Sequence, residues 1–313
     1  MIYEKIKLYE DRADVTLTTY VHSDSPELLH GKKRPAILVC PGGAYLTCSD
    51  REGEPVALRF ASMGYHAFVL RYSTYMGGGF SYPDPTKEIP VNPKSIYPNP
   101  MRDIAKAILF IRDHSNKWLV DTEKIILCGF SAGAHNCAMY SVYWNDPDLS
   151  RYFNVSSEEL KPAAAILGYM LSDLIFQRDF VFKQESLTAK HLFESFSVAY
   201  TGMREPDDET LKRISPVLYV SEFTPPMFLW TTAQDELVSA EHTILMAKAL
   251  AEKNIPFEMH IFEEGQHGLS LAHQATARYK DQINPIVAKW IDLAEQWLLR
   301  RFSLDLQEKE KNF

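Results

Sequence analysis

A serine between two glycines is the first feature of this sequence that could do chemistry. It lies in the stretch Gly129-Phe130-Ser131-Ala132-Gly133, directly after the apolar run 124–130 and before a segment that reads as a helix. A strand, a sharp turn and a helix in this order hold a serine in a strained backbone conformation, and the flanking glycines remove side chains that would clash. The context favours an exposed nucleophile at Ser131 over an ordinary serine in a strand-to-helix turn.

A serine hydroxyl is a weak nucleophile unless a nearby base takes its proton. After an elbow of this kind the partners follow along the chain as an acid and then a histidine. Asp235 comes just after one predicted strand and His267 comes in the loop after the next, so both would lie at the carboxyl edge of a parallel sheet. We therefore expect Asp235 to be the acid and His267 the base. Glu236 is the alternative acid, with Glu263 and Glu264 as weaker alternatives.

Attack on a carbonyl group creates a negative oxygen, which needs preorganised N–H donors. The backbone N–H of Ala132 would lie at the start of a helix, where the helix dipole favours negative charge. A second source is the run Pro41-Gly42-Gly43-Ala44-Tyr45, which follows the predicted strand 34–40. The N–H groups of Gly43 and Ala44 are the expected donors of this oxyanion hole, and a plain turn is the alternative.

Aromatic and histidine residues lie next to these groups in the sequence, and we expect different roles for them. Tyr45 and Phe130 flank the expected site in the sequence, so we expect them to bind substrate by narrowing the acyl pocket in favour of acetyl; simple packing is the alternative. His135, on the helix after the elbow, is expected to pack behind the site. His260 lies within a predicted strand and is expected to be structural.

Strand-like and helix-like patterns alternate along the chain and would position these residues. Apolar runs predict strands at 34–40, 65–72, 124–130, 163–170, 226–233 and 257–262, and alternation predicts a half-exposed strand at 14–21. Helices are predicted at 54–64, from the Asn99-Pro100 cap onward, at 239–254, and near the C-terminus, where Ile286, Trp290, Leu293 and Trp297 share a face. This order implies an α/β fold with a mostly parallel central sheet and helices on both faces.

Two longer stretches interrupt the alternation. One runs from about 73 to 100 and is rich in proline and glycine, and the other runs from about 171 to 216 and mixes aromatic with acidic residues. Long insertions between sheet elements usually serve as lids or binding loops. We therefore expect a single domain over 1–313, with a loop insertion at 73–100 and a cap-like insertion at 171–216.

Composition excludes several classes of function. The chain has 313 residues, 46% of them hydrophobic, which is enough for one large core. The formal net charge of -8 and the lack of a basic patch argue against nucleic acid and anionic membrane surfaces as partners. No long apolar run predicts a membrane span, and the N-terminus does not resemble a secretory signal. Four cysteines without zinc spacing suit a reducing compartment, so we expect a cytoplasmic protein without a metal site.

Together these stretches resemble an α/β-hydrolase esterase. Over about 34–273 the chain is similar to the acetyl esterase and lipase group related to hormone-sensitive lipase, and most similar to bacterial intracellular acetyl-xylan-esterase-like proteins. The matching stretches are RPAILVCPGGAY, REGEPVALRF, GYHAFVLRYS, KIILCGFSAGAH, FLWTTAQDELV and EEGQHGLSLA. The resemblance implies the same catalytic and oxyanion residues as the reasoning above: Ser131, Asp235 and His267, with Gly43, Ala44 and Ala132.

Two positions depart from the lipase pattern. The lipase motif His-Gly-Gly-Gly is replaced by Pro41-Gly42-Gly43-Ala44, a form that the resemblance assigns to the acetyl-esterase branch, and Ala44 still supplies an N–H. Ala134 follows Gly133 where many relatives have a second glycine. A methyl group there would crowd the helix packing slightly without abolishing catalysis.

The resemblance implies a serine carboxylesterase that hydrolyses short-chain, mainly acetyl, esters in two acyl-transfer steps, without a metal or organic cofactor. Acetylated sugars or xylo-oligosaccharides are the expected substrates, with Tyr75, Tyr82 and Tyr97 available to stack on sugar rings. A serine peptidase of the prolyl-oligopeptidase type is one alternative, although the chain has no room for a propeller. A non-catalytic ligand-binding protein on a hydrolase scaffold is the other, although such proteins tend to lose a triad member. The natural alcohol stays open, and so does the oligomeric state, with a homo-oligomer included.

Overall fold

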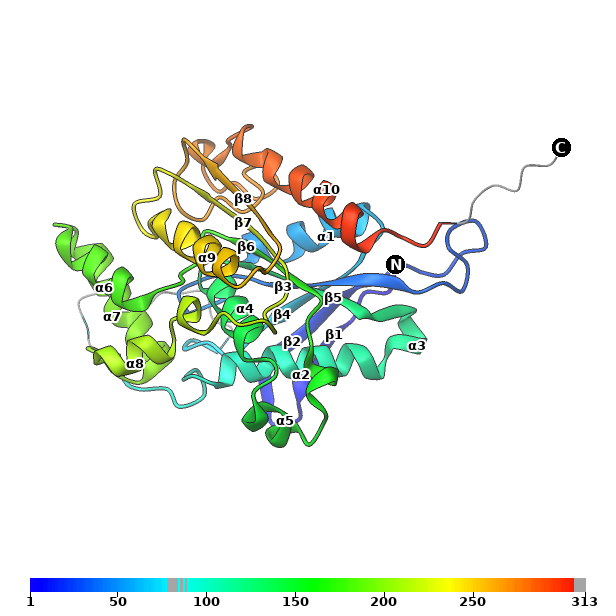
Figure 1. Cartoon of the computed structure of the whole chain (residues 1–313), viewed down its shortest axis with the longest axis horizontal. Coiled ribbons are helices and arrows are strands. Elements are labelled where there is room, and N and C mark those ends of the chain that lie inside the picture. The colour runs from blue at the N-terminus through cyan, green and yellow to red at the C-terminus, as the bar shows by residue number, and fades with distance from the viewer. Residues whose placement is uncertain (78–83, 85–86, 88, 307–313) are drawn as a thin grey trace.

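An eight-stranded sheet forms the centre of the structure, a computed structural model that describes residues 1–77, 84, 87 and 89–306 (Figure 1). The strands are β1 (Lys5–Tyr9), β2 (Arg12–Tyr20), β3 (Arg34–Cys40), β4 (His66–Arg71), β5 (Val120–Phe130), β6 (Ala164–Gly168), β7 (Met227–Thr232) and β8 (Phe257–Phe262). They lie in the order β1-β2-β4-β3-β5-β6-β7-β8. The pairings among β1, β2 and β4 are antiparallel, and those from β4 to β8 are parallel. The predicted α/β class with a mostly parallel sheet is confirmed.

The strands that lead into the expected site are buried on both faces. All seven residues of β3 and all six of β7 are buried, and so is the second half of β5. A parallel sheet covered by helices on both sides requires such continuous apolar runs. Strand β1 was not predicted: it has only five residues, KIKLY, and lies half-exposed at the edge of the sheet.

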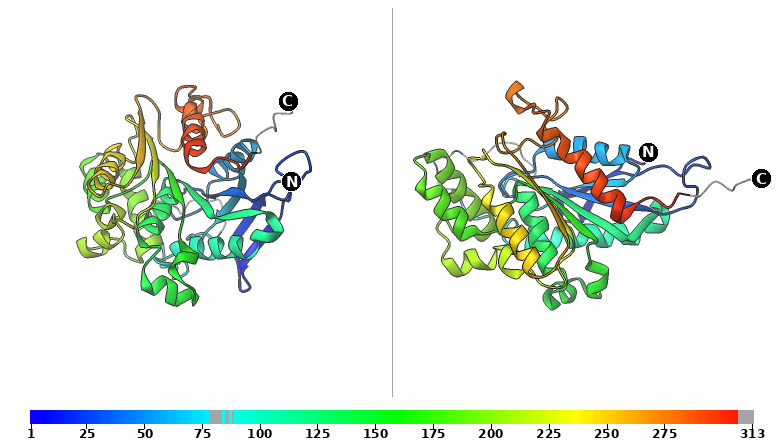
Figure 2. Two further views of the ribbon diagram at one scale, coloured as in Figure 1. Left: turned by 45° about the vertical axis from the view of Figure 1, so that its right-hand side comes forward. Right: turned by 45° about the horizontal axis from the view of Figure 1, so that its top comes forward.

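Helices cover both faces of the sheet (Figures 1 and 2). The main ones are α1 (Glu54–Ser62), α2 (Asn99–Asp113), α4 (Ala132–Tyr143), α9 (Glu241–Glu252) and α10 (Trp290–Phe302), with shorter α3 (Ser115–Trp118) and α5 (Pro147–Phe153). α1 and α10 share one buried apolar cluster with the sheet, while α2, α4 and α9 share another. The sheet therefore lies between two apolar layers, and its carboxyl edge is left for the loops that carry polar residues.

Helix boundaries differ from the prediction: the helices predicted at 54–64 and 239–254 are shorter, and two other helix starts are shifted. Asn99 is the first residue of α2 rather than its cap, and Pro98 precedes it. Ile286 was expected on the apolar face of the last helix, but it precedes α10 and is 59% exposed. Residues Val287–Lys289 form a tighter 3₁₀ turn, which changes the register so that Val287 is buried in its place.

The segment 171–216 contains helices α6 (Leu174–Lys183), α7 (Leu187–Thr201) and α8 (Asp208–Arg213), which lie together at one end of the molecule, at the left of Figure 1. The described part of the 73–100 segment packs against α7. Ser95 Oγ donates to the carbonyl of Ala199, and the N–H of Tyr97 donates to the carbonyl of Tyr200, both over 2.8 Å. Tyr82, Gly78 and Gly79 of the same segment lie outside the described residues.

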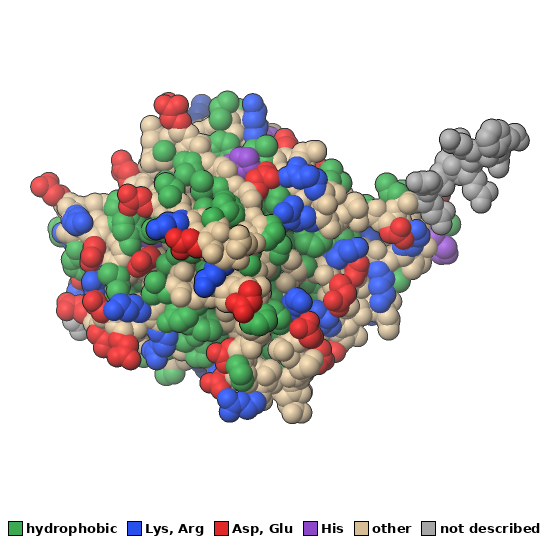
Figure 3. Space-filling model, viewed as in Figure 1, with side chains coloured by type: hydrophobic (Ala, Val, Ile, Leu, Met, Phe, Trp, Pro, Cys, Tyr) green, Lys and Arg blue, Asp and Glu red, His purple; other side chains and the backbone are tan. Residues whose placement is uncertain are grey.

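The outer surface carries charges of both signs. On the face shown in Figure 3, acidic and basic side chains are interspersed. Among the described residues, no helix combines the length and the apolar character that crossing a bilayer would need. Cys40, Cys48, Cys128 and Cys137 are all unpaired and buried.

Candidate active site

Ser131 lies at the sharp turn between β5 and α4, as predicted. Its φ of 50° and ψ of -122° are a backbone conformation that residues other than glycine rarely adopt. Its N–H donates to the carbonyl of Gly168 on β6 over 3.0 Å. A Cβ on Gly133 would come within 2.1 Å of the carbonyl oxygen of Cys40, and one on Gly129 within 2.5 Å of the carbonyl oxygen of Gly133. Close packing therefore requires both glycines, and the predicted elbow is confirmed.

The structure brings Ser131, His267 and Asp235 together from three separate loops. Nε2 of His267 lies 2.9 Å from Oγ of Ser131, and Nδ1 lies 2.7 Å from Oδ2 of Asp235. An ionised carboxylate can only accept hydrogen bonds, so Nδ1 carries the ring proton and Nε2 accepts from the serine hydroxyl. An imidazole held in this tautomer is ready to remove that proton.

The Asp235 carboxylate is held by the backbone of its own loop. The side chain is fully buried, and its Oδ1 accepts from the N–H groups of Leu237 at 3.0 Å and Val238 at 2.9 Å. Its other oxygen is thereby left to face the imidazole. The alternative acids Glu236, Glu263 and Glu264 are exposed, and within the described residues none of them is hydrogen-bonded to His267.

Opposing effects act on the pKa of His267. Burial of the ring disfavours its charged form and lowers the pKa. The negative charge of Asp235, the hydrogen bond to it and the charge of Glu52 outweigh burial, so the pKa of His267 lies above its usual value. These carboxylates would stabilise the imidazolium that forms when Ser131 loses its proton.

The loop after β3 lies directly against the elbow. A Cβ on Gly42 would come within 2.6 Å of the carbonyl oxygen of Phe130 and 2.8 Å of Cβ of Ser131, so only glycine allows this approach. Ala44 and Tyr45 then take left-handed φ angles of 54° and 56°. Non-glycine residues in such conformations cost about 1–3 kcal/mol each and persist where the surroundings impose them, often at functional sites.

The expected oxyanion donors are free to act. Gly43 and Ala44 are partly exposed, and among the described residues no carbonyl or side chain accepts from their N–H groups. Ala132 is the first residue of α4, where a helix leaves its N–H groups without an internal partner. Ala44 lines the same cavity as Ser131, and Ala132 follows Ser131 at the start of α4, so these residues and Gly43 stay candidates for an oxyanion hole.

Tyr45 and Phe130 do not take the places predicted for them. The Tyr45 ring is fully buried and stacks on Tyr200, with ring centroids 4.0 Å apart. Phe130 is fully buried on the other face of the sheet, edge-on to Trp290. Neither lines the cavity at Ser131, so their predicted role in narrowing the acyl pocket is wrong. The left-handed turn at residues 44–45 and the side-chain alternation along β5 direct both rings into the core.

His135 packs behind the site, as predicted. Its Nε2 lies 2.8 Å from the carbonyl of Ile214 and so carries the proton, while Nδ1 accepts from the Tyr45 hydroxyl at 2.7 Å. Burial lowers the pKa of His135 to about 4, so the ring is neutral at pH 7. His260 lies on β8 and pairs with Glu258 at 3.0 Å, away from Ser131.

Two residues that were not predicted from the sequence lie next to the hydrogen-bonded relay of Ser131, His267 and Asp235. Glu52 is buried and accepts a hydrogen bond from the N–H of Gly42, and the Tyr169 ring lies edge-on to His267 with centroids 5.0 Å apart. Glu52 belongs to the charged run Asp50-Arg51-Glu52, which reads as surface, and Tyr169 falls in an apolar run that reads as core. Glu52 lies in the family-like stretch REGEPVALRF, but neither its residue type nor that of Tyr169 indicates burial beside the site.

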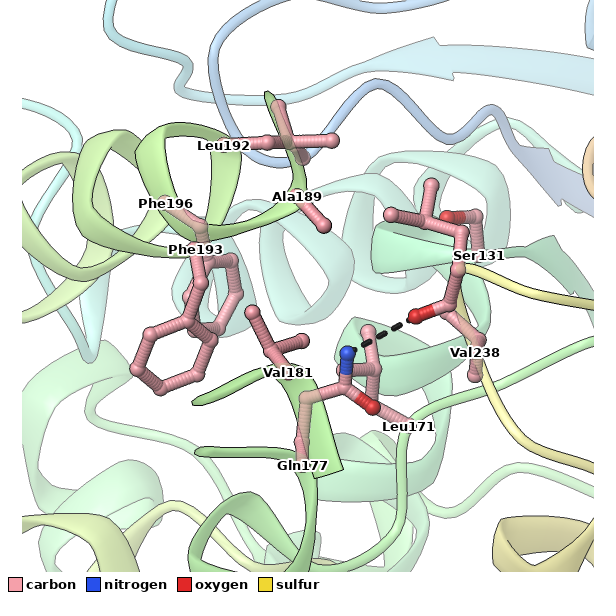
Figure 4. A pocket seen from close by; sticks show the side chains of 11 residues that line it. Ser131, Leu171, Gln177, Val181, Ala189, Leu192, Phe193, Phe196 and Val238 are labelled. Atoms are coloured by element: carbon pink, nitrogen blue, oxygen red, sulfur yellow. Dashed lines mark hydrogen bonds between the residues drawn. The ribbon is translucent and has the colours of Figure 1, made fainter. Parts of the chain in front are cut away.

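An apolar cavity opens at Ser131 and is lined by side chains of α6 and α7 among others (Figure 4). Its volume is about 40 Å³, and it is lined by Ala44, Ser131, Leu171, Gln177, Val181, Ala189, Leu192, Phe193, Phe196, Leu237 and Val238. Gln177 is the one amide in this lining. Its Nε2 donates to the carbonyl of Leu237 over 2.9 Å, and its Oε1 lies 2.8 Å from Nε2 of His242. Both ends of the amide are satisfied, so the cavity is apolar apart from the serine hydroxyl.

A larger and more open hollow of about 1070 Å³ borders Asp235 and His267 and shares Leu237 with the cavity. Its polar lining side chains include Gln184, Gln234, Glu236 and Gln266. Tyr75 and Tyr97, expected to stack on sugar rings, line neither space; Tyr97 packs edge-on to Tyr200 instead.

A mostly parallel eight-stranded sheet, with a Ser–His–Asp relay in the loops after β5, β7 and β8, defines a hydrolase of the α/β-hydrolase class. The model of the BD-FAE family matches residues 88–250, just over half of the chain. The chain belongs to the BD-FAE family.

Three known proteins show the extent of the likeness. Endo-1,4-beta-xylanase B from Butyrivibrio fibrisolvens is 33% identical over 259 residues, which is 82% of this chain and 35% of that protein, so the chain spans about a third of its length. The carboxylesterase Cest-2923 from Lactobacillus plantarum WCFS1 has a TM-score of 0.76 and 26% identity, covering 98% of this chain and 100% of that one. The acetyl ester-xyloside bifunctional hydrolase from Caldicellulosiruptor lactoaceticus has a TM-score of 0.71 and 28% identity, covering 96% and 97%. With the family match, these likenesses place the chain among the carboxylic ester hydrolases.

Proposed function

We propose that this chain is a serine carboxylesterase that removes short acyl groups, acetyl above all, from polyhydroxylated alcohols such as acetylated sugars or xylo-oligosaccharides. The observation that carries the proposal is the relay of Ser131, His267 and Asp235 at the mouth of an apolar cavity of about 40 Å³. The catalytic roles of these residues, and those of the oxyanion amides, belong to the proposal.

In the acylation step His267 takes the proton from Ser131, and the serine oxygen attacks the ester carbonyl. The buried charge of Asp235 stabilises the imidazolium that forms. The carbonyl oxygen becomes negative and accepts hydrogen bonds from the N–H groups of Gly43, Ala44 and Ala132. Losing one such donor typically costs about 3 kcal/mol of transition-state stabilisation.

His267 then gives its proton to the leaving alcohol, which departs and leaves an acyl-serine ester. In the second half of the reaction His267 takes a proton from water, and the hydroxide oxygen attacks the acyl carbonyl. The same amides hold the second oxyanion, and Ser131 leaves with the proton returned from the ring. Acid and enzyme are released without any redox change.

The size of the cavity supports a short acyl group. A cavity of about 150 Å³ is enough to take up benzene. The space of about 40 Å³ beside Ser131 accommodates an acetyl methyl group with little to spare. An additional methylene in a hydrophobic pocket is worth about 1–3 kcal/mol of discrimination, so longer chains that do not fit are disfavoured.

The open hollow supports a polar alcohol. The amides of Gln184, Gln234 and Gln266 can both donate to and accept from sugar hydroxyl groups. One relative is described as an endo-1,4-beta-xylanase and another as an acetyl ester-xyloside bifunctional hydrolase, which favours an acetylated xylose-based substrate.

Residues 1–313 would act as one hydrolase domain, with the helices of 171–216 as its cap over the acyl cavity. Leu171, Val181 and Phe193 of that segment line the cavity, which supports this reading. The place of action would be the cytoplasm, which the four unpaired, buried cysteines suit.

The test compares 4-nitrophenyl acetate, butyrate and octanoate with acetylated xylo-oligosaccharides, using the purified chain. We expect kcat/KM to be highest for acetate and to fall with chain length, and acetate to be released from the oligosaccharides. Ser131→Ala should abolish hydrolysis and labelling by a fluorophosphonate. Ser141→Ala removes a buried hydroxyl on the same helix that has no hydrogen-bond partner among the described residues; it is the matched control and should keep both.

Each other outcome points elsewhere. Labelling without ester hydrolysis would mean that the relay works but the substrate class is wrong. Faster cleavage of dipeptide anilides than of acetate esters would favour a peptidase. The absence of labelling in the folded wild-type chain would favour a non-catalytic binding protein.

A further inference from the structure

A buried carboxylate lies behind the loop 41–45, here called the oxyanion loop, and both of its oxygens accept hydrogen bonds. Glu52 is 4% exposed, and its Oε2 accepts from the N–H of Gly42 over 2.7 Å. Its Oε1 accepts from the hydroxyl of Tyr169 over 2.6 Å. Acidic side chains are seldom buried to this degree unless they are paired. The two partners lie in different loops, one after β3 and the other at the end of β6.

Tyr169 extends this contact to the loop that carries the base. Its hydroxyl accepts from the N–H of Ser270 over 3.1 Å, so its own proton is left to donate to Glu52. Its ring lies edge-on to the imidazole of His267, three residues before Ser270. The backbone of Tyr169 takes a positive φ of 38°, a strained conformation for a bulky residue.

Ser270 makes two further hydrogen bonds that fix its loop near Glu52 and Tyr169. The Ser270 hydroxyl donates to the carbonyl of Arg51 over 2.7 Å, and the Ser270 carbonyl accepts from the indole N–H of Trp290 over 2.8 Å. A continuous chain of buried hydrogen bonds therefore joins Gly42, Glu52, Tyr169 and Ser270. It links the loop with the expected oxyanion donors to the loop with the general base.

We propose that Glu52 and Tyr169 are positioning residues that hold the oxyanion loop and the His267 loop in a fixed relation around Ser131. This inference rests on the proposed function of the site. Neither residue touches the reacting atoms. The carboxylate fixes Gly42, and so the direction in which the next two N–H groups point, while the phenol holds the imidazole from behind.

The charge of Glu52 has a second effect. The ionisable groups near His267 are Asp235 after β7, Glu52 after β3 and Tyr169 after β6, with Arg51 beside Tyr169. Two carboxylates facing one imidazole favour its protonated form, and Glu52 contributes to the raised pKa of His267. Removing the charge of Glu52 should therefore make His267 a weaker base that stays neutral to lower pH.

Glu52→Gln keeps the volume of the side chain but has a single acceptor oxygen. The N–H of Gly42 and the hydroxyl of Tyr169 each need an acceptor, so one of them loses its hydrogen bond. We expect kcat for 4-nitrophenyl acetate to fall by about 10- to 100-fold, because small displacements of preorganised groups cost rates of this order. KM should change less than twofold, since the acyl cavity is not altered. The acid limb of the kcat/KM profile should move to lower pH.

Two further variants separate the effect of the negative charge of Glu52 from the effect of its hydrogen bonds. Glu52→Asp keeps the charge but is too short to hold both partners, so the acid limb should stay in place while kcat falls. Tyr169→Phe removes one hydroxyl, leaves the Ser270 N–H without an acceptor and should lower kcat without moving the acid limb. Glu54→Gln is the matched control: this exposed carboxylate two residues away accepts from Tyr20 instead, and its variant should match the wild type.

The proposal is overturned if folded Glu52→Gln keeps kcat within twofold and leaves the acid limb in place. If that variant does not fold, as judged by circular dichroism, wild-type kcat in both Glu52→Asp and Tyr169→Phe overturns it equally. The rate of fluorophosphonate labelling at Ser131 is measured in parallel and needs no ester substrate. A wild-type chain that labels but hydrolyses no ester contradicts the proposed function alone, and the positioning role is then judged by the labelling rates of the variants.

Discussion

The carboxylate of Asp235 performs two different tasks, which makes Asp235→Asn a sharp test of the relay. Oδ1 accepts from two backbone N–H groups, those of Leu237 and Val238, and Oδ2 accepts from the ring N–H of His267. Asparagine replaces one of these oxygens by an NH₂ group, which can only donate. If the NH₂ group faces the backbone, it meets two other donors, the N–H groups of Leu237 and Val238. If it faces the imidazole, it meets only the ring N–H of His267.

The asparagine amide should therefore direct its NH₂ group at His267. Nδ1 must then accept, so the ring proton moves to Nε2 and faces Ser131. An imidazole in this tautomer cannot take the serine proton. In a Ser–His–Asp triad of this kind the same substitution lowers kcat by about 10⁴-fold, which corresponds to about 5 kcal/mol of transition-state stabilisation. We expect a loss of that order in kcat/KM, with little change in KM.

The assay is the initial rate with 4-nitrophenyl acetate at pH 7.5, with folding checked by circular dichroism. Glu263→Gln, at an exposed carboxylate after β8, is the matched control and should keep the wild-type rate. Glu236→Gln tests the alternative acid and should cost less than tenfold. The reasoning is refuted if Asp235→Asn keeps more than a tenth of the activity, or if Glu236→Gln causes the larger loss.

Three other measurements follow from the structure. Because the base must be neutral and the pKa of His267 is raised, kcat/KM should decline toward acid pH with a midpoint above the usual 6.5, and a midpoint below that value would contradict the charge arrangement. Phe193→Ala enlarges the acyl cavity, so the ratio of butyrate to acetate kcat/KM should rise by about tenfold, and an unchanged ratio would remove Phe193 from the acyl site. Burial raises the pKa of Asp103 to about 6, although hydrogen bonds from Ser73 oppose the shift. The folded state therefore holds this proton more tightly than the unfolded chain, and stability from this source is complete below pH 3.8 and is lost as pH rises through 6. In urea unfolding, the wild type should lose about 2 kcal/mol relative to Asp103→Asn between pH 4 and pH 7, whereas parallel curves would refute the shift.

Local patterns were enough to predict the parts of the site that stand at strand ends. The apolar run before Ser131 identifies a buried strand, and a serine between glycines directly after such a strand is typical of a nucleophile elbow. Asp235 and His267 follow because parallel strands bring their carboxyl ends to one edge, whatever their separation in the sequence. The position of the loops predicts that these side chains lie near one another, and the structure adds the hydrogen-bond distances of 2.7 Å and 2.9 Å.

Adjacency in the sequence was a poor guide to the walls of the cavity. Tyr45 and Phe130 are next to expected site residues, yet the backbone turns each ring into the core. The side chains that do line the cavity, such as Val181 and Phe193, come from the segment 171–216, which was predicted as a cap-like insertion without any role for its individual residues. Their place depends on how α6 and α7 pack on the sheet, which periodicity within each helix does not specify.

The buried polar groups behind the site were beyond sequence reasoning for a different physical reason. A carboxylate is costly to bury, so a lone Glu in a charged run is correctly read as exposed unless its partners are known. The partners of Glu52 are a backbone N–H ten residues away and a phenol 117 residues away. Only the assembled fold brings them into contact, and there the ionised form is the one that satisfies both donors at once. Burial of Glu52 is thus a consequence of the same loop convergence that assembles the relay, which is why a change at Glu52 should be felt at Ser131.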